Sequence, residues 1–372
     1  MLPRVLHVGP IPPPLGGISV MMESLMKAKP LRAFENSCFN TSWGTTWALA
    51  GYKKFSTERF VRRIKLASEL ALHVRRLRPH IIHFQCGSGG PWDFPADALM
   101  YLGAKTSHAR MIFHWHRDPA TATFPGKSIA TRTFFGATAG TADSLIVLSE
   151  RYRQSLSQSY KNKAYVVPNA FDSALLLLPC PRPLKSCIRV IFIGRLTREK
   201  GIVDFFQLAS YLVDRIPDVQ FVLAGVPSPV EGGMRHLREL VNELGLGKNV
   251  MFVGPVTGDE KLDFFNQGDI MLLPSYRESF GIAALEGMAA GIPVLAYSIG
   301  LLPDLIRDGE AGFLEDSGNV HALSSRLLQL IEDPSLRARM GQNGREEAKQ
   351  KYTVNVVAEK VRDIYTALME RD

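Results

Sequence analysis

Short apolar runs recur along the chain, and each is followed by a turn and then a longer amphipathic stretch. Runs of this kind, bounded by Gly or Pro, predict buried strands. They are residues 5–8, 81–85, 111–118, 145–149 and 164–169 in the first half, and residues 190–194, 220–225, 250–256, 270–274 and 293–297 in the second. Because strands that alternate with helices favour parallel pairing, the pattern predicts an α/β protein with mostly parallel sheets.

Three longer stretches, residues 57–78, 320–332 and 353–369, have apolar residues at helical spacing. A further helix is expected to follow the glycine pair near residue 17. In the stretch 57–78 the residues expected to form the buried face are Phe60, Ile64, Ala67, Ala71 and Val74.

The length of 372 residues exceeds what one ordinary core supports, so two domains are expected. Residues 170–187 contain three prolines and a run of leucines, which is typical of an interdomain connection. A new series of strands and helices then begins at Val190. The predicted domains are residues 1–175 and 176–351, followed by a terminal helix over 352–372.

The stretch 274–293 carries the clearest candidate chemistry, since Glu278 and Glu286 stand eight residues apart in a predicted strand–loop–helix unit. Ser279 is expected to cap the helix and Gly291 to end it. Free N–H groups at such a helix start suit a phosphate, and the two carboxylates can accept hydrogen bonds from sugar or ribose hydroxyls. The alternative is a carboxylate that complements the helix dipole and a solvated helix residue.

Two glycine turns each follow a predicted strand and precede a helix. The first contains Gly16 and Gly17, and the second begins at Gly194 and adds the cations Arg195 and Lys200. Such turns bring backbone N–H groups close to a phosphate, and Arg and Lys can bind a diphosphate. Tight turns that merely need glycine, or a charged surface turn, are the alternatives.

Histidines mark the end of the predicted strand 111–118. Alternation places His114 and His116 on one face, with His116 nearer the carboxyl end of the strand, followed by Asp118. Ligands of open α/β sheets lie beyond that end, where a histidine can orient a hydroxyl or move a proton. A packed, hydrogen-bonded histidine is the alternative.

Charge is unevenly distributed. Residues 1–175 hold 22 Lys and Arg against 10 Asp and Glu, a balance of +12, and the totals of 44 and 36 leave 22 against 26, or −4, for the rest. A basic surface can meet nucleic acid, phosphorylated ligands or an anionic membrane, and once the other motifs are considered nucleic acid is not expected as a partner. Arg59, Arg62 and Arg63 form a basic cluster on the predicted helix 57–78, which suits anionic lipid headgroups or is simply a solvated face.

The remaining composition narrows the class of protein. No apolar run approaches the roughly 20 residues of a membrane span, and the first residues form a short strand and not a signal peptide, so the cytoplasm is the expected location. The four cysteines lack metal-type spacing and are expected to be free thiols. No metal ion is expected.

Taken together, these residues resemble the large retaining glycosyltransferase family 4, also called glycosyl transferases group 1, which has the GT-B fold. The resemblance spans nearly the whole chain. It rests on Gly16-Gly17, on Val167-Pro168-Asn169, on Gly194-Arg195-Leu196 with Lys200-Gly201, on Glu278 with Glu286, and on the segment 287–294. It implies two Rossmann-like β/α/β domains that face each other across a cleft. The first would be on the acceptor side, the second would bind a nucleotide-sugar, and the last helix would cross back to the first domain.

The resemblance also implies roles. Arg195 and Lys200 would contact the diphosphate and stabilise the leaving group, Glu278 would hold donor-sugar hydroxyls, and Glu286 would accept the ribose hydroxyls. His116 would lie near the reacting sugar. The remaining substrate-binding positions would be Gly16, Gly17, Asn169, Gly194, Val256, Ser279, Phe280, Gly281, Ile282 and Leu285. The donor would be a UDP- or GDP-sugar, acting as substrate with no cofactor, and its leaving phosphate would take the acceptor proton.

The expected acceptor is a saccharide or a lipid-linked saccharide, in surface polysaccharide or glycolipid synthesis. One departure from the family pattern concerns donor choice: Gly300 is followed by Leu301, and Asp304 stands where Glu is usual. The chain has no Asp-x-Asp, which argues against metal-dependent sugar transfer of the other common fold. Two alternatives stay open, namely a nucleotide-sugar epimerase of the same fold and a non-catalytic nucleotide-sugar-binding subunit. A nicotinamide dehydrogenase fits less well, because neither glycine turn reads GxGxxG.

Overall fold

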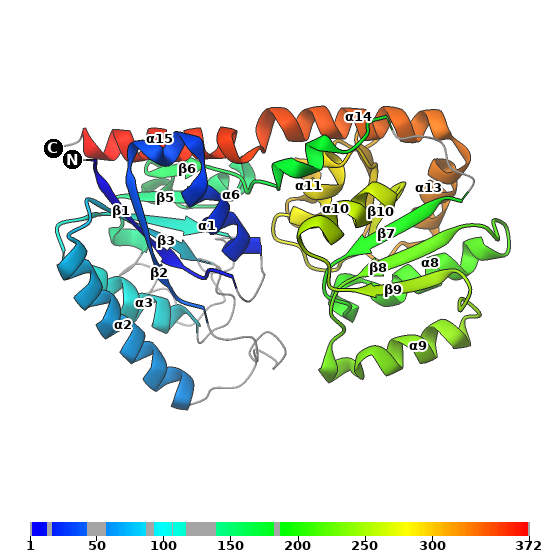
Figure 1. The fold of residues 1–372 in the computed structure, drawn as a ribbon, viewed down its shortest axis with the longest axis horizontal. Coiled ribbons are helices and arrows are strands. Elements are labelled where there is room, and N and C mark those ends of the chain that lie inside the picture. The colour runs from blue at the N-terminus through cyan, green and yellow to red at the C-terminus, as the bar shows by residue number, and fades with distance from the viewer. Residues whose placement is uncertain are drawn as a thin grey trace. The chain divides into compact units, whose positions relative to one another are not determined.

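The computed structural model describes residues 2–12, 17–42, 57–86, 93–105, 107–116, 139–181 and 187–370, with the backbone alone at 57–60, 63, 93–98 and 139. The chain folds into two units, drawn in Figure 1. Unit 1 contains Met1–Ala170 together with Val354–Asp372, and unit 2 contains Phe171–Thr353. The boundaries therefore fall after residues 170 and 353, where the sequence suggested 175 and 351.

Unit 1 is built on a six-stranded parallel sheet with the strand order β2-β1-β3-β4-β5-β6. The strands are β1 (Arg4–Gly9), β2 (Glu35–Asn40), β3 (Ile81–Cys86), β4 (Arg110–Trp115), β5 (Ser144–Val147) and β6 (Ala164–Val166). Its helices are α1 (Gly17–Lys27), η1 (Lys29–Ala33), α2 (Thr57–Leu77), α3 (Asp93–Ala104), η3 (Ala139–Thr141), α6 (Glu150–Gln154), α7 (Gln158–Lys161) and α15 (Val354–Met369). The sequence did not predict β2, an edge strand of mixed polarity, because it has no apolar run.

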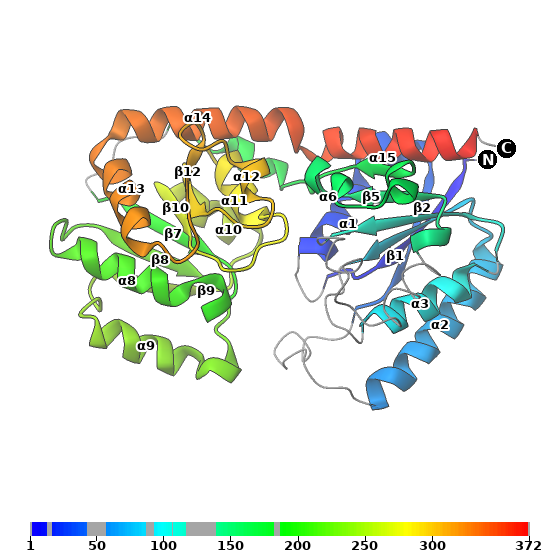
Figure 2. The same ribbon diagram turned by 180° about the vertical axis from the view of Figure 1, so that it is seen from behind.

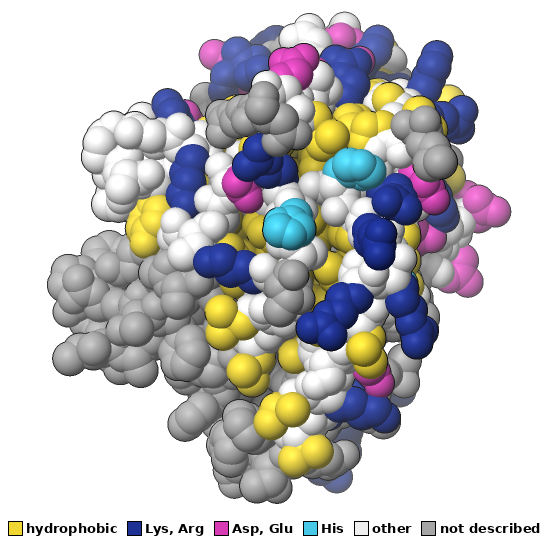
Figure 3. Space-filling model, turned by 90° about the vertical axis from the view of Figure 1, so that its left-hand side faces the viewer, with side chains coloured by type: hydrophobic (Ala, Val, Ile, Leu, Met, Phe, Trp, Pro, Cys, Tyr) yellow, Lys and Arg dark blue, Asp and Glu magenta, His cyan; other side chains and the backbone are white. Residues whose placement is uncertain are grey.

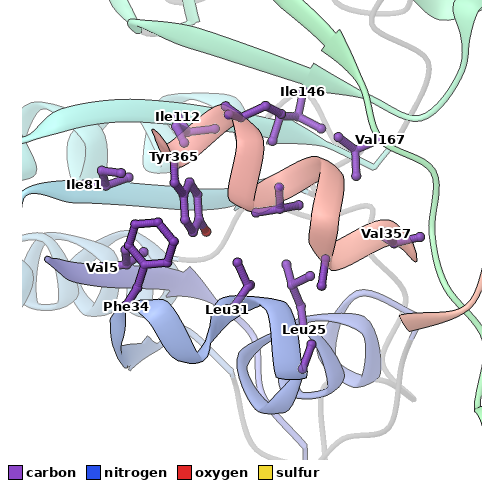
Figure 4. Close-up of a cluster of buried hydrophobic side chains, with 14 of the residues drawn as sticks. Val5, Leu25, Leu31, Phe34, Ile81, Ile112, Ile146, Val167, Val357 and Tyr365 are labelled. Atoms are coloured by element: carbon purple, nitrogen blue, oxygen red, sulfur yellow. The ribbon is translucent and has the colours of Figure 1, made fainter. Parts of the chain in front are cut away.

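Both faces of this sheet are covered, and alternation assigns the residues of each strand to one face or the other. Val5, Ile81, Ile112 and Ile146 lie on the face that packs against α15, together with Leu25 and Leu31 from α1 and η1. Figure 4 shows this core, with Tyr365 of α15 among these side chains. The opposite face carries Phe84 and Phe113, which contact Tyr101 of α3. The C-terminal helix is thus part of the core of unit 1.

Helix α2 differs in part from its predicted packing. Val74 is completely buried, and Gly103 of α3 lies so close that a Cβ there would stand 2.9 Å from Ala67 O and 3.7 Å from Ala71 Cβ. Ile64, however, is 45% exposed, so its predicted place on the buried face is wrong. In Figures 1 and 2 the first turns of α2 extend past the end of α3, so α3 leaves this part of α2 uncovered. Phe60 lies among the residues whose side chains the structure does not describe.

Unit 2 contains a second six-stranded parallel sheet, in the order β12-β11-β10-β7-β8-β9. The strands are β7 (Arg189–Ile193), β8 (Gln220–Ala224), β9 (Val250–Gly254), β10 (Ile270–Leu273), β11 (Val294–Tyr297) and β12 (Gly312–Glu315). The helices are η4 (Ser173–Leu177), η5 (Arg198–Lys200), α8 (Ile202–Val213), η6 (Pro229–Glu231), α9 (Gly233–Glu243), α10 (Gly258–Gln267), α11 (Ile282–Ala289), α12 (Leu302–Leu305), α13 (Val320–Glu332) and α14 (Pro334–Lys351). Helix α8 packs against α13, and α11 packs against α14.

No helix was predicted over the residues of α9, α10 or α12. Two other elements of unit 2, β12 and α14, escaped prediction for physical reasons. β12 is a short edge strand, and α14 is mostly polar. Three of the six buried residues of α14 are small, namely Gly341, Gly344 and Ala348, and a Cβ at Gly341 would lie 2.2 Å from the backbone oxygen of Gly291. A helix that packs through glycine leaves no apolar stripe in its sequence. The predicted α/β class with two Rossmann-like domains is confirmed.

Candidate functional site

Three loops at the carboxyl edge of the unit 2 sheet are packed backbone to backbone. Tyr276 N–H, in the loop after β10, donates to Glu199 O at 2.9 Å, in the loop after β7. Gly201 has φ +73° and lies so near Pro274 that a Cβ there would stand 1.7 Å from Pro274 O. Gly300, after β11, would place a Cβ 1.9 Å from Glu278 O. Because glycine allows these contacts, the three loops form one compact surface at the edge where ligands of parallel sheets bind.

Lys200 and Glu278 meet on this surface. Lys200 Nζ donates to Glu278 Oε2 at 2.5 Å, and the two side chains are about one-fifth exposed, at 20% and 21%. Lys200 Nζ also lies 3.3 Å from Arg277 O. The structure therefore brings together two residues that stand 78 positions apart and that the sequence singled out separately. A cation and a carboxylate side by side can bind an anionic group and a hydroxyl at adjacent positions.

Helix α11 starts beside this pair, but not as predicted. Its N-cap is Gly281, with φ 90° and no side-chain cap, so Ser279 does not cap the helix. The left-handed conformation explains the change, because glycine adopts it at little cost. The first hydrogen bond runs from Leu285 N–H to Gly281 O, so the N–H groups of Ile282, Ala283 and Ala284 precede it. Gly291, with φ +73°, follows the helix end as predicted.

Glu286 lies four residues into α11 and is buried, not solvated. Its side chain is 10% exposed and forms an ion pair with Lys261 of α10, which is 20% exposed. Burial raises the pKa of the Glu286 carboxyl above its ordinary value, and Lys261 opposes that shift. A buried carboxylate held by one lysine retains oxygen lone pairs that can accept hydrogen bonds.

A buried carboxylate anchors the loop after β10 from below. Asp204 of α8 is 8% exposed, and its Oδ2 accepts from the hydroxyls of Tyr276 and Tyr297, each at 2.6 Å. The bond to Asp204 raises the pKa of Tyr276 to about 12. Both tyrosines therefore stay protonated at neutral pH and donate. This network fixes the loop that carries Glu278.

Arg195 lies at the rim of the same edge. It is exposed, and its Nη2 is 3.9 Å from Glu199 Oε2, whose other oxygen is 3.1 Å from Arg277 Nη1. Gly194 and Gly225 directly follow strands β7 and β8, and a Cβ at Gly225 would lie 1.7 Å from Gly194 O. The glycine at 225 thus serves the close packing of the two strand ends, whereas a Cβ at Gly194 would make an ordinary contact with the Phe192 ring, at 3.5 Å.

The other predicted residues of unit 2 are placed less directly. Phe280 is buried and packs edge-on against Tyr352, with ring centroids 6.1 Å apart, and Leu285 is completely buried. Their side chains belong to the core, so only their backbones could meet a ligand. Val256 and Ile282 are partly buried.

In unit 1, His116 and Asn169 are brought together at the carboxyl edge of the sheet. His116 is 4% exposed, with Nδ1 3.0 Å from Asn169 Oδ1 and Nε2 2.7 Å from Gln85 Oε1. Burial lowers the pKa of His116 to about 4, and the contact with Asn169 opposes this shift. His114 stacks on His116 with ring centroids 4.1 Å apart, so the two share one face as predicted.

Some predictions fall partly or wholly outside the described residues. Gly17 begins α1, whereas Gly16 and Asp118 are not described, nor are the side chains of Arg59 and Arg63. Among the described residues, no group of three or more His, Cys, Asp or Glu side chains is placed to hold a metal ion.

Sequence reasoning missed Lys261 and Gln85. Lys261 lies in α10, a helix without a clear apolar stripe, and Gln85 looks like an ordinary polar residue in an apolar strand. Only the facing residues, Glu286 and His116, give them a role. A polar residue at the last inward position of a buried strand was the one signal that could have pointed to Gln85.

Residues 185–347 match the family model described as Glycosyl transferases group 1. The D-inositol 3-phosphate glycosyltransferase of Corynebacterium glutamicum is 35% identical over 162 residues, which are 43% of this chain and 39% of that protein. The Corynebacterium diphtheriae protein of the same name is 34% identical over 176 residues, 47% of this chain and 41% of that protein. The chain thus spans about two-fifths of the length of these curated relatives.

Solved structures match over nearly the entire chain. A glycosyltransferase from Rickettsia africae has a TM-score of 0.79 at 17% identity, with all of both chains covered. Anabaena HepE in complex with UDP and glucose has a TM-score of 0.76 at 18% identity, covering 98% of this chain and 99% of that one. At these identities the similarity establishes the fold, which is that of the GT-B glycosyltransferases.

Proposed function

We propose that this chain, which belongs to the glycosyl transferases group 1 family through residues 185–347, is a retaining glycosyltransferase that uses a nucleotide-sugar donor. The observation that carries the proposal is the Lys200–Glu278 pair, held at 2.5 Å beside the start of α11. The cation and the N-terminal N–H groups of the helix suit a diphosphate, and the carboxylate suits the hydroxyls of a sugar. Because all three lie at one edge of the sheet, a sugar diphosphate fits them better than a sugar or a diphosphate alone.

In this proposal the diphosphate lies over the start of α11. The N–H groups of Ile282, Ala283 and Ala284 donate to its oxygens, and Lys200 and Arg195 supply positive charge. As the bond to the sugar breaks, negative charge grows on the leaving oxygen, and these groups stabilise it. Glu278 accepts hydroxyls of the sugar, next to Lys200.

Glu286 accepts the ribose hydroxyls. It lies one turn further along α11 than the first N–H groups, and we assign it to the nucleoside side of the phosphates. Lys261 opposes the rise in the Glu286 pKa that burial causes and so favours the ionised form, which has the acceptors that two neighbouring hydroxyls need. UDP in the HepE complex makes a UDP-sugar the first donor to test, and a GDP-sugar the second.

The acceptor we propose is a saccharide or a lipid-linked saccharide, reached at an anionic membrane surface through unit 1. Val61, Ile64 and Leu72 of α2 are 64%, 45% and 54% exposed. Figure 3 shows such apolar side chains interspersed with Lys and Arg on one face of the molecule. Apolar residues among cations are the composition that lies on headgroups without inserting deeply. No helix in the described part of the chain is long and apolar enough to cross a bilayer.

The membrane part is tested by flotation with vesicles containing one-third phosphatidylglycerol against pure phosphatidylcholine. Binding to the anionic vesicles should fall several-fold in the double variant Val61→Asp, Ile64→Asp. The matched control is Val230→Asp, which changes a residue that is 78% exposed in unit 2. Equal flotation of both variants would argue against α2 as the docking element.

The transferase itself is tested in two steps. A thermal-shift screen with UDP, GDP, ADP and their sugar conjugates should reveal one nucleotide series, since a ligand at 100 times its Kd adds about 2.7 kcal/mol of stability. Transfer or hydrolysis of that sugar is then measured in Lys200→Met, Glu278→Gln and the exposed control Lys248→Met. We expect at least about a tenfold loss in the first two, or 1.4 kcal/mol of transition-state stabilisation, and none in the control.

Three results would count against this proposal. Near-normal turnover in both Lys200→Met and Glu278→Gln would show that these residues do not take part in the reaction. A free epimerised sugar in place of a glycosidic bond would identify an epimerase. Binding of a nucleotide-sugar without any product, with or without vesicles, would indicate a non-catalytic binding subunit.

A further inference from the structure

A row of hydrogen-bonded side chains runs across the face of the unit 1 sheet that α15 covers. It begins at Tyr365, whose hydroxyl lies 2.6 Å from His83 Nδ1. His83 Nε2 lies 3.3 Å from Gln85 Nε2, and Gln85 Oε1 lies 2.7 Å from His116 Nε2. His116 Nδ1, 3.0 Å from Asn169 Oδ1, ends the row. The row therefore links the C-terminal helix to the carboxyl edge of the sheet.

The histidines of this row are neutral at pH 7. His83 and His116 are 0% and 4% exposed, and burial lowers the pKa of both rings, to about 4 for His116. A neutral imidazole carries one proton, so one nitrogen donates and the other accepts. His116 faces an amide oxygen on each side, and a single proton can satisfy only one of them. One of the two amides must therefore turn its NH₂ group toward the ring, by a half-turn about its last side-chain bond.

The Tyr365 end of the row shows which amide turns. The hydroxyl lies 2.6 Å from His83 Nδ1, and if it accepted a proton from that nitrogen, its own proton would need another acceptor. Among the described residues His83 is also the one hydrogen-bond partner of this hydroxyl. Tyr365 therefore donates to His83 Nδ1, and the proton of His83 is on Nε2.

The remaining protons then follow along the row. His83 Nε2–H needs an acceptor, which Gln85 provides by turning its oxygen toward His83 and its NH₂ toward His116. His116 Nε2 accepts from that NH₂, so the proton of His116 is on Nδ1 and is donated to Asn169 Oδ1.

His114 completes the count, because its Nδ1 is 3.3 Å from His83 Nε2 and its Nε2 has no partner among the described residues. In the arrangement just given, only that Nε2–H is unpaired. In the reverse arrangement two groups are unpaired, the Tyr365 proton and the lone pair of His114 Nε2. Buried polar groups left unpaired are disfavoured, so the first arrangement prevails.

We propose that Gln85 is a positioning residue which, with its orientation set by Tyr365 through His83, holds His116 as the Nδ1–H tautomer. This inference rests on the proposed function and on the role near the reacting sugar that the family resemblance implies for His116. It assigns His116 the part of a hydrogen-bond donor through Nδ1–H, toward a sugar hydroxyl oxygen that shares this proton with Asn169. It excludes His116 as the base that accepts the acceptor proton, because Nε2 is occupied by Gln85.

The test reads the tautomer directly. Long-range ¹H–¹⁵N correlation spectra of protein labelled with ¹⁵N-histidine, at pH 7.5, distinguish protonated from unprotonated ring nitrogens, and the His116→Asn variant identifies the signals of residue 116. We expect a protonated Nδ1 and an unprotonated Nε2. In Gln85→Glu the new carboxylate has no proton to donate, so Nε2 of His116 should gain one. In Tyr365→Phe the bias is lost, and the Nε2–H form should rise to a tenth or more.

The matched control is Tyr101→Phe. Tyr101 is also completely buried in unit 1, but its hydroxyl lies 2.8 Å from Thr141 Oγ1 and not next to a histidine. This variant should leave the His116 signals unchanged. A protonated Nε2 in the unsubstituted protein, or an unaltered Nε2 in Gln85→Glu, would overturn the proposal.

Turnover separates this inference from the proposed function. With an active donor, Gln85→Glu should lower kcat about tenfold and change KM for the nucleotide-sugar less than threefold. An equal loss in the Tyr101→Phe control would argue against a positioning role. Absence of any sugar transfer in the unsubstituted protein would refute the proposed function, while the spectra would still decide the tautomer.

Discussion

Removing the charge of Lys261 should destabilise unit 2 in a way that depends on pH. Lys261 pairs with Glu286, whose side chain is 10% exposed, and burial already raises the pKa of that carboxyl above its ordinary value of 4.5. Lys261→Met keeps a straight apolar stem and deletes the ammonium group. Glu286 is then left either charged without its partner or protonated.

The loss of stability in Lys261→Met equals the free-energy cost of the less costly state, which is either a charged, unpaired Glu286 or a protonated one. Protonating a carboxyl of pKa 4.5 at pH 7.5 costs about 4 kcal/mol, at about 1.36 kcal/mol for each pH unit. Breaking a fully buried pair costs on the order of 3–5 kcal/mol. Because Lys261 is 20% exposed, water can replace part of its effect, so we expect a loss of about 2–3 kcal/mol at pH 7.5. At pH 5 protonation costs only about 0.7 kcal/mol, and the loss cannot exceed that from this cause.

The sign follows from linkage. A carboxyl whose pKa is higher in the folded than in the unfolded state binds more protons when folded. Its contribution to stability therefore falls as the pH rises from 4.5 toward the folded value, and that value is higher in the variant. The difference in the free energy of unfolding between the variant and the unsubstituted protein should therefore increase over this pH interval.

The assay is urea unfolding followed by far-ultraviolet circular dichroism at pH 5 and pH 7.5. Lys261→Arg should retain most of the stability, because it keeps the charge. Lys27→Met removes a comparable pair, with Glu23, in which the two side chains are 72% and 41% exposed, and should cost no more than about 0.5 kcal/mol at either pH. Equal losses at the two pH values in Lys261→Met would refute the reasoning, because they would show a packing effect and not a buried charge.

Three further substitutions test the packing of the candidate site. Gly341→Ala should lower the free energy of unfolding, measured with urea, by about 2 kcal/mol or more, because its Cβ would lie 2.2 Å from Gly291 O. The control is Gly344→Ala in the same helix, whose Cβ would lie 3.4 Å from Met288 Cγ and which should cost under about 1 kcal/mol. Equal costs would show that α14 adjusts freely. Gly300→Ala should weaken nucleotide binding at least about fivefold, measured by isothermal titration, because its Cβ would lie 1.9 Å from Glu278 O and would displace the backbone there. Unchanged affinity would show that this loop is not part of the binding site. Asp204→Ala leaves the hydroxyls of Tyr276 and Tyr297 without their acceptor and should lower stability by about 2–3 kcal/mol, while the exposed control Tyr211→Phe should change it by less than about 0.5 kcal/mol.

Apolar runs predicted most of the two sheets, because a parallel strand that is buried on both faces consists almost entirely of apolar residues. β2 and β12 were missed because edge strands do not need a fully apolar run. The cap at Gly281 was missed because a left-handed φ is a property of the folded loop, and Ser279 two residues earlier gives the more familiar signal. α14 was missed because Gly341 and Gly344 leave no apolar stripe.

The candidate site divides in the same way. Glu278, Glu286 and Lys200 stand out in the sequence because charged residues next to glycine turns and apolar strands are unusual. Lys261 and Gln85 act only through a partner that is distant in sequence, by 25 residues for Glu286 and 31 for His116. Reading one chain gives no information on such pairs, so these two residues required the structure.

The return of α15 to unit 1 has a consequence for synthesis on the ribosome. Val357, Val361, Ile364 and Tyr365 fill the core around Val5 and Ile81, yet the 183 residues from Phe171 to Thr353 are translated in between. At about 5–20 residues per second, unit 1 waits on the order of 10–40 seconds without α15, so that part of one face of its sheet stays uncovered. Unit 2 is continuous in the chain and needs no such wait. The unit that is translated first is therefore completed last, after unit 2 has been synthesised.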